Sequence, residues 1–148
     1  MIDLEKDPLT DKIIGWAIEV HKRLGPGLLE SVYESALCVE LEHHGLKLQC
    51  QVALPLKYRE RLIGELRLDI VVENSVILEL KSVERMEPLF EAQLLTYLRL
   101  SGIRTGLLIN FNSQPFAPPR NQAIRTLIIP YPKLCGLCDS VAILLFAC

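Results

Sequence analysis

Apolar residues recur every three or four positions between residues 13 and 24, which predicts an amphipathic helix. Thr10 is the expected N-cap of this helix, and the Gly-Pro-Gly run at 25–27 is the expected stop. Similar spacing from Leu29 to His44 predicts a second helix. Each helix has one apolar side, so both must cover another layer of structure.

The period of the apolar positions then changes to two. Every even position from Leu46 to Tyr58 is apolar, which predicts a strand buried on one face. A turn near residues 59–61 leads into a second alternating run, Leu62 to Val72, and a turn at 73–75 precedes the apolar run from Val76 to Val83. The middle of the chain is therefore predicted to be a three-stranded antiparallel meander.

Helical spacing returns beyond Pro88 and ends at Gly102, and Thr105 to Phe111 follows as a buried strand. Asn112 to Asn121 holds three prolines and is expected to be a loop, after which Ala123 to Ile129 is the last predicted strand. The predicted fold class is α/β (α+β), with a central mixed sheet of four to five strands flanked by helices.

Composition agrees with one ordinary domain. The chain has 148 residues, 50% of them hydrophobic, so it can bury a core without disulfides. Residues 1–130 are expected to form the domain, and residues 131–148 an apolar, Cys-containing tail that leaves a homodimer open. Charged residues make up 23% and the net charge is −2, which argues against a disordered chain and against a strongly basic nucleic-acid binder.

Charge is nevertheless unevenly distributed. Residues 1–91 carry 11 Lys/Arg and 17 Asp/Glu (net −6), whereas residues 92–148 carry 5 and 1 (net +4). One basic flank is therefore available to a polyanion, with scattered solvated cations as the plainer alternative. Its members are Arg99, Arg104, Arg120, Arg125 and Lys133.

The five cysteines are odd in number and lack a disulfide-framework spacing, which favours a reducing compartment. The first eleven residues are acidic, and the apolar run at 141–148 is too short to cross a membrane. We therefore expect a cytoplasmic protein without a membrane partner. Cys135 and Cys138 form a single C-x-x-C pair, for which packing is favoured over zinc, and His21, His43 and His44 are expected at exposed positions.

Candidate chemistry lies in the hairpin around Asn74. If the turn is centred there, Asp69 faces Glu79 and Arg67 faces Lys81, with all four side chains on one face of the sheet. The opposite, apolar face would hold Leu66, Leu68, Ile70, Val72, Val76, Leu78 and Leu80.

Directly opposed side chains have Cβ atoms about 5 Å apart, where two like charges are destabilising unless a positive charge lies between them. Mg²⁺ (or Mn²⁺) would supply that charge through Asp69, Glu79 and the Leu80 carbonyl, leaving other positions for a phosphate. Lys81 on the same face would assist attack by water, which suits phosphodiester hydrolysis. The alternative is a solvated surface network in which Arg67 and Lys81 simply neutralise the two acids.

Two further pairs could join this site. Glu30 and Tyr33 form a Gly-x-x-Glu-x-x-Tyr run with Gly27 at the start of the second helix. Gln93 and Tyr97 lie four apart on the third helix, where an amide and a phenol could approach a phosphate or merely close the core.

Taken together, these segments resemble the GxxExxY family of the PD-(D/E)XK nuclease superfamily. The resemblance is carried by GLLESVYE (27–34), LRLDIVV (66–72), VILELKSVE (76–84), EAQLLTYL (91–98) and GLLINFN (106–112), in that order. It implies a restriction-endonuclease-like α-β-β-β-α-β core and a Mg²⁺-dependent nuclease-like site.

The resemblance also implies a role for each site residue. Asp69 and Glu79 would be metal ligands, Glu30 the helix acid that joins them, and Lys81 the catalytic lysine, with Gln93 and Tyr97 as catalytic support. The expected function is a metal-dependent endo- or exonuclease acting on DNA or RNA. The alternatives are a non-catalytic module that binds nucleic acid or protein, and a structural subunit that dimerises through its tail.

Overall fold

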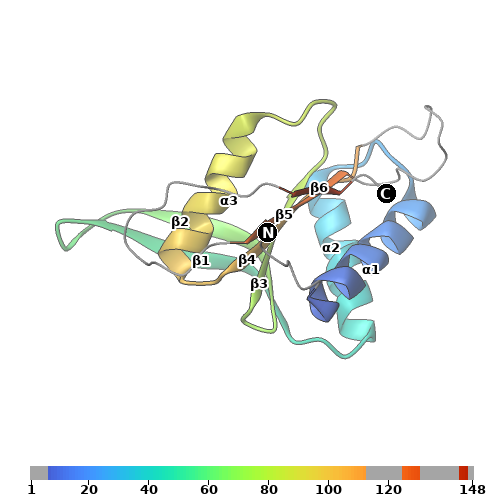
Figure 1. Ribbon diagram of the computed structural model, residues 1–148, viewed down its shortest axis with the longest axis horizontal. Coiled ribbons are helices and arrows are strands. Elements are labelled where there is room, and N and C mark those ends of the chain that lie inside the picture. Colours follow the sequence, from blue (N-terminus) through green and yellow to red (C-terminus); the bar gives the residue numbers. More distant parts are fainter. Residues whose placement is uncertain (1–6, 113–124, 131–143, 147–148) are drawn as a thin grey trace.

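The computed structural model describes residues 7–112, 125–130 and 144–146 (Figure 1). Its elements, in chain order, are α1 (Pro8–Leu24), α2 (Glu30–His43), β1 (Leu48–Tyr58), β2 (Arg61–Val72), β3 (Val76–Lys81), α3 (Pro88–Ser101), β4 (Thr105–Asn110), β5 (Arg125–Pro130) and β6 (Leu144–Phe146). The predicted loop from Asn112 to Asn121 lies almost wholly outside the described residues, as do Cys135, Cys138, Arg120 and Lys133.

The strands form one mixed sheet in the order β1-β2-β3-β4-β5-β6. Only β3 and β4 are parallel, and α3 is the crossover that parallel neighbours require. The predicted meander and mixed α/β class are confirmed. The sheet has one strand more than the four to five expected, because Leu144–Phe146 of the predicted tail pairs with β5. Among the described residues, no helix has the length and apolarity needed to span a membrane.

Helices cover both faces of the sheet and create two apolar cores. Figure 1 shows α1 and α2 on one side and α3 on the other. The α1/α2 core includes Ile70 and Leu78, whereas the α3 core includes Val71 and Ile77, as strand alternation requires. Gly106 on β4 lets α3 approach closely, since a Cβ there would lie 2.9 Å from the Leu94 side chain.

Helix α1 begins earlier than the sequence pattern indicated. Asp7 is the N-cap, accepting the Leu9 N–H at 3.2 Å and the Thr10 hydroxyl at 2.9 Å, and Pro8 fills the first helical position. The prediction of Thr10 as the cap is therefore wrong, because an Asp-Pro pair three residues earlier starts the helix. The predicted stop is confirmed, with Gly25 closing the helix at a φ of 72°.

His21 is buried in the core rather than exposed. It follows Ala17 by one helical turn, and its ring lies 6.3 Å from that of Phe111. Burial lowers the pKa of His21 below its usual 6.5, and Nε2 has no hydrogen-bond partner. The prediction of an exposed His21 is wrong because the apolar stripe of α1 is wide enough to include it. His43 and His44 are exposed as predicted.

We expect His21→Leu to remove part of the acid sensitivity of folding. The unfolded chain takes up a proton at His21 near pH 6.5 and the folded chain only at lower pH, so stability falls on acidification below 6.5. Each pH unit in that window costs up to about 1.4 kcal/mol. Between pH 7.5 and pH 5.5, the melting temperature should fall less for His21→Leu than for wild type. The control His43→Leu, at an exposed position, should show the same fall as wild type. Equal losses in all three proteins would contradict this account.

Candidate active site

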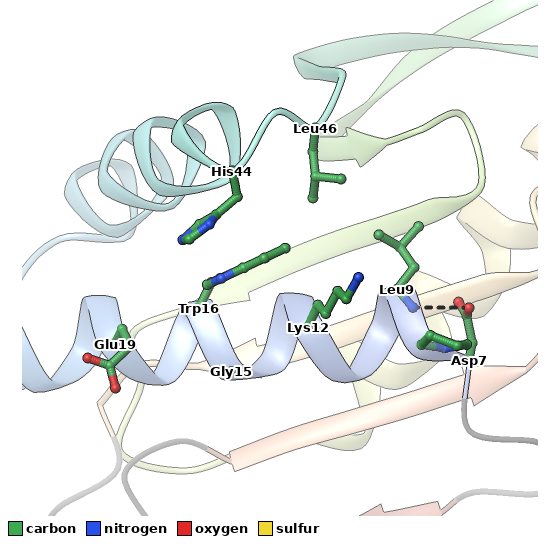
Figure 2. Close-up of a pocket in the computed structure, with 9 residues that line it drawn as sticks. Asp7, Leu9, Lys12, Gly15, Trp16, Glu19, His44 and Leu46 are labelled. Atoms are coloured by element: carbon green, nitrogen blue, oxygen red, sulfur yellow. Dashed lines mark hydrogen bonds between the residues drawn. The ribbon is translucent and has the colours of Figure 1, made fainter.

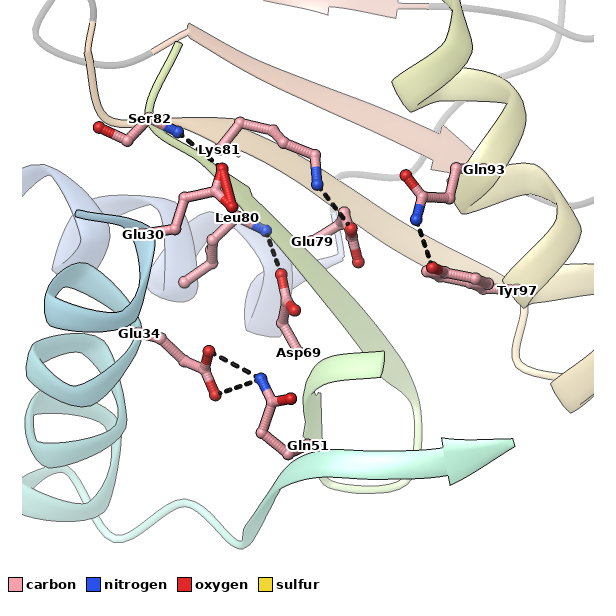
Figure 3. Close-up of polar contacts among 10 residues, drawn as sticks. All are labelled: Glu30, Glu34, Gln51, Asp69, Glu79, Leu80, Lys81, Ser82, Gln93 and Tyr97. Atoms are coloured by element: carbon pink, nitrogen blue, oxygen red, sulfur yellow. Dashed lines mark hydrogen bonds and ion pairs between the residues drawn. The ribbon is translucent and has the colours of Figure 1, made fainter. Parts of the chain in front are cut away.

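Strands β2 and β3 separate at the point where the predicted acids lie. Pairing follows the expected register at Val72–Val76, Val71–Ile77 and Ile70–Leu78, but no further pair is formed. Beyond it, Asp69 Oδ2 accepts the backbone N–H of Leu80 at 2.8 Å (Figure 3). A side-chain carboxylate thus satisfies an amide that a continued ladder would have paired. Leu80, whose carbonyl is the expected metal ligand, thus contacts Asp69 through its N–H.

The separation coincides with a change of face in the β1–β2 hairpin. Gln51 has a φ of 54°, in the left-handed region, between the pairs Cys50–Ile70 and Val52–Leu68. Ile70 belongs to the α1/α2 core, yet Leu68 two residues earlier belongs to the α3 core. In a regular strand both would share one face. The prediction that Leu66 and Leu68 continue the face of Ile70 is therefore wrong.

This change of face also removes Arg67 from the site. Arg67 pairs with Ala53 across the β1–β2 ladder, and its guanidinium lies 3.3 Å from exposed Glu65. The predicted juxtaposition of Arg67 with Lys81 is wrong, because β2 has left β3 before Arg67 is reached.

Glu79 and Lys81 form a buried ion pair on the α3 side of the sheet. Lys81 Nζ lies 2.8 Å from Glu79 Oε1, and the exposed fractions of the two side chains are 12% and 3%. The ammonium also lies 5.2 Å from the centroid of the Phe90 ring on α3. Glu79 Oε2 is buried without a hydrogen-bond partner. The solvated network considered as an alternative does not describe a pair this deeply buried.

Burial first, and neighbouring charges second, shift the pKa values of this pair and of Asp69. Burial, then the charge of Asp69, raises the pKa of Glu79 to about 7, although Lys81 opposes the rise. Burial likewise raises the pKa of Asp69, against the Leu80 N–H and Lys81. Burial would lower the pKa of Lys81, but the carboxylates, Glu79 first, raise it. One lysine thus serves two acids, and a further positive charge would stabilise their ionised forms.

The Gly-x-x-Glu-x-x-Tyr run anchors the start of α2 beside this pair. Buried Tyr33 stacks on Phe111 at 4.5 Å, donates its hydroxyl to the Gly25 carbonyl at 2.5 Å, and accepts the Leu28 N–H at 3.2 Å. These contacts fix the loop between α1 and α2, in which Gly27 has a φ of 93°.

Glu30 then reaches the segment that follows Lys81. Its Oε2 accepts the Ser82 N–H at 3.1 Å, and the Ser82 hydroxyl donates to the Leu28 carbonyl at 2.6 Å. The charge of Glu30 acts on Asp69, Glu79 and Lys81, so the structure brings the helix acid to the rim of the site.

Gln93 and Tyr97 approach the site from α3. Gln93 Nε2 donates to the Tyr97 hydroxyl oxygen at 2.5 Å, and Tyr97 is buried. Burial raises the pKa of Tyr97, and the charges of Glu79 and Asp69 raise it further, which places the phenol within their field. Figure 3 shows both side chains on the side of the sheet that carries Glu79.

Asn110 is a positioning residue that sequence reasoning missed. It is buried at the end of β4, accepts the Val83 N–H at 3.1 Å and donates to the Val83 carbonyl at 2.8 Å. These bonds hold the chain just beyond Lys81 against β4. An amide that interrupts the otherwise apolar run from 106 to 111 was the available signal.

Glu34 and Gln51 form a second missed pair. Gln51 Nε2 donates to both carboxylate oxygens of Glu34 at 2.8 Å, and the charge of Glu34 also acts on Asp69. The positions of Glu30 and Glu34, one helical turn apart, were a signal that both could face the same site.

The donors fit a hard divalent cation held by two carboxylates. Glu79 offers a buried, unpartnered oxygen, and the raised pKa of both acids shows that added positive charge would be favourable. Among residues 7–112 and the two short strands that the structure describes, no three His, Cys, Asp or Glu side chains are grouped to hold a metal. Mg²⁺ commonly takes one or two carboxylates and keeps water or phosphate at its other positions, so Asp69 and Glu79 would suffice.

A cavity of about 750 Å³ lies elsewhere, between α1 and the end of α2 (Figure 2). Trp16 and His44 stack at its wall with ring centroids 4.4 Å apart. None of the predicted site residues lines this cavity, so it does not contribute to the carboxylate site.

Comparison with known proteins supports the interpretation drawn from this geometry. Searches of curated proteins and of solved structures found no match. A family model described as the PD-(D/E)XK nuclease superfamily matches residues 7–122, which include every residue of the site described above. A mixed sheet flanked by helices, with an Asp at the separation of two strands and Glu-x-Lys on the second, agrees with that match. The chain therefore belongs to the PD-(D/E)XK nuclease superfamily.

Proposed function

We propose that this protein is a Mg²⁺-dependent nuclease of the GxxExxY group that hydrolyses phosphodiester bonds of DNA or RNA. One observation carries the proposal: Glu79 is buried with a free oxygen beside Asp69 and Lys81. Most buried polar atoms have a hydrogen-bond partner, and a bound cation would account for the open acceptor of Glu79.

Asp69 and Glu79 are the proposed ligands of Mg²⁺ or Mn²⁺, and Glu30 is the proposed third acid. When bound, the cation would neutralise charge on the phosphodiester and lower the pKa of the attacking water. The Leu80 N–H holds one oxygen of Asp69 in place, and the Ser82 N–H does the same for Glu30. These backbone donors orient the acids before any ligand arrives.

Lys81 is the proposed catalytic lysine. Its raised pKa keeps the ammonium charged at neutral pH, so it can stabilise negative charge that develops on the phosphate oxygens. Its ammonium contacts Glu79 and lies over the Phe90 ring. Gln93 and Tyr97 would support the site from α3, where the phenol can donate a hydrogen bond to a phosphate oxygen.

We also propose a cytoplasmic location. The chain has five cysteines, an odd number, without the spacing of a disulfide framework. That usage suits a reducing compartment.

We expect Asp69→Asn and Lys81→Met each to lower Mg²⁺-dependent cleavage by at least about 10²-fold. Asparagine can still accept the Leu80 N–H, and methionine preserves the length of the lysine stem, so the fold should be retained. Cleavage of labelled DNA and RNA in single- and double-stranded form would be measured, with circular dichroism to verify folding. Arg23→Met, which removes an exposed cation in the last turn of α1, away from the site, should cleave at the wild-type rate.

Metal-dependent cleavage that persists in both site variants would remove the proposed site. Binding of nucleic acid by wild type with no cleavage under any divalent metal would favour the non-catalytic module instead.

We also expect the site to lower stability at neutral pH in the absence of metal. Folded Glu79 has a pKa of about 7 against a usual 4.5, so the folded chain keeps a proton that the unfolded chain has lost. Stability from this residue is thus highest below pH 4.5 and falls as pH rises through 7, by roughly 3 kcal/mol in all.

Glu79→Gln should not show that fall. In EDTA, the difference in unfolding free energy between wild type and Glu79→Gln should become less favourable to wild type between pH 4.5 and 8. At pH 8, Mg²⁺ should raise the melting temperature of wild type more than that of Glu79→Gln. Parallel pH profiles with equal responses to Mg²⁺ would show that Glu79 is not the group that titrates.

A further inference from the structure

The β1–β2 hairpin continues well beyond the sheet that supports the site. Pairing of β2 with β3 stops at Ile70–Leu78, whereas pairing of β1 with β2 runs on to Tyr58–Arg61. Figure 1 shows this hairpin projecting past α3, away from α1 and α2. We call residues 57–64 the arm. Because β2 is continuous from the arm to Asp69, anything bound along the arm also approaches the acids.

The arm exposes apolar side chains that its neighbours leave uncovered. The exposed fractions of Tyr58, Leu62 and Ile63 are 62%, 67% and 60%. They stand among three cations, Lys57, Arg59 and Arg61, with Glu60 as the one acid between them. The arm is thus basic and apolar. It lies within residues 1–91, which carry 11 Lys/Arg and 17 Asp/Glu and a net charge of −6.

The cations of the arm are available to a partner. Among the described residues no carboxylate forms an ion pair with Lys57, Arg59 or Arg61, although Arg67 pairs with Glu65 on the same strand. The Arg59 guanidinium instead lies 5.7 Å from the centroid of the Tyr58 ring. A cation over an exposed ring keeps its hydrogen-bond donors free for phosphate.

The two residues at the tip of the arm are charged, although their backbone conformation is one that glycine and asparagine adopt more easily. Arg59 and Glu60 form a two-residue connection with φ values of 46° and 64°. Two-residue hairpin turns with both φ values positive strongly prefer Asn-Gly or Gly-Gly. A residue with a Cβ in this region typically costs about 1 kcal/mol or more. The tip therefore carries backbone strain while it presents an arginine at the outermost point.

We propose that the arm binds double-stranded DNA beside the scissile bond, an inference that rests on the proposed nuclease function. A two-stranded ribbon fits the major groove of B-form DNA, whereas the major groove of A-form RNA is too narrow to admit it. Arg59, Arg61 and Lys57 would contact phosphates, and the apolar side chains would lie against the bases and sugars.

The length of β2 sets the span of the contact. Eight positions separate Arg61 from Asp69, which corresponds to about 26 Å along a strand. At 3.4 Å per base pair this is about eight base pairs to one side of the cut.

The experiment measures binding apart from cleavage, by fluorescence anisotropy of the full chain with a 30-base-pair duplex in EDTA. Arg59→Ala/Arg61→Ala should weaken binding about tenfold and reduce the slope of log K against log salt by about two. The control Lys22→Ala/Arg23→Ala removes two positive charges from α1. Its duplex affinity and its salt slope should both match those of wild type.

A second variant separates the arginine from net charge and from folding. Arg59→Asn/Glu60→Gly leaves the net charge unchanged and supplies the preferred turn, so its melting temperature should rise. Its salt slope should nevertheless fall by about one. Unchanged duplex affinity in both arm variants, absence of duplex binding by wild type, or equal losses in the α1 control would overturn the proposal. A dimer that dissociates in the arm variants with DNA affinity intact would overturn it too, because the occupant would then be a second copy of the chain.

Failure of the arm and failure of the nuclease are distinguishable. Duplex binding that depends on the arm, without cleavage under any metal, supports the arm and removes the nuclease. Cleavage that depends on Asp69 and proceeds equally in the arm variants supports the nuclease and removes the arm.

Discussion

The hydrogen bond from the Leu80 N–H to Asp69 Oδ2, at 2.8 Å, is the contact on which the rest of the site depends. It forms where β2 and β3 stop pairing, and it satisfies an amide that would otherwise be orphaned in a buried strand. Without it the separation of the two strands would cost the free energy of an unsatisfied amide. With it, the same carboxylate that stabilises the separation is held next to Glu79. The same hydrogen bond thus ends the regular pairing of β2 with β3 and positions a carboxylate in the site.

The ion pair between Glu79 and Lys81, beside that contact, is buried among more acids than one lysine can neutralise. Glu79 is almost completely buried, and its field includes the charges of Asp69 and Glu30 as well as that of Lys81. Replacing such a pair with apolar residues of similar volume is often neutral or favourable in proteins. A buried lysine that faces several acids is therefore an observation that supports the proposed cation site. Membership of the nuclease superfamily is consistent with that explanation.

Much of this arrangement follows from sequence patterns, and the failures have local causes. The turn at Asn74 and the alternation around it predicted the register that the structure shows at Ile70–Leu78. The pattern could not show where that register ends. The change of face lies at Gln51, a residue type that rarely adopts a positive φ, while the alternation of β2 runs on unbroken through Asp69.

Burial of single polar residues was equally hard to predict. Asn110 lies within an apolar run, and His21 lies on a helix of mixed character. Asparagine and histidine are both common at exposed positions, so residue type alone does not fix their burial. What decides their burial is contact with distant segments: Val83 for Asn110, and Phe111 for His21. The helices, the antiparallel meander of β1, β2 and β3, and the shared face of Glu79 and Lys81 depend on local sequence patterns, which is why those features could be predicted.

The Gly-x-x-Glu-x-x-Tyr run shows why a motif can mix structural and chemical roles at short spacing. Tyr33 points into the core and ties the loop before α2 through two hydrogen bonds, while Glu30, nearly one turn earlier, points out and holds the Ser82 amide. One residue fixes the helix, and the other uses the fixed helix to reach the strand that carries Lys81. Replacement of Tyr33 would disturb Glu30, since the position of Glu30 is defined only as well as the loop that Tyr33 anchors. The spacing of three is therefore set by the geometry of a helix start, in which adjacent turns can serve the core and the site at once.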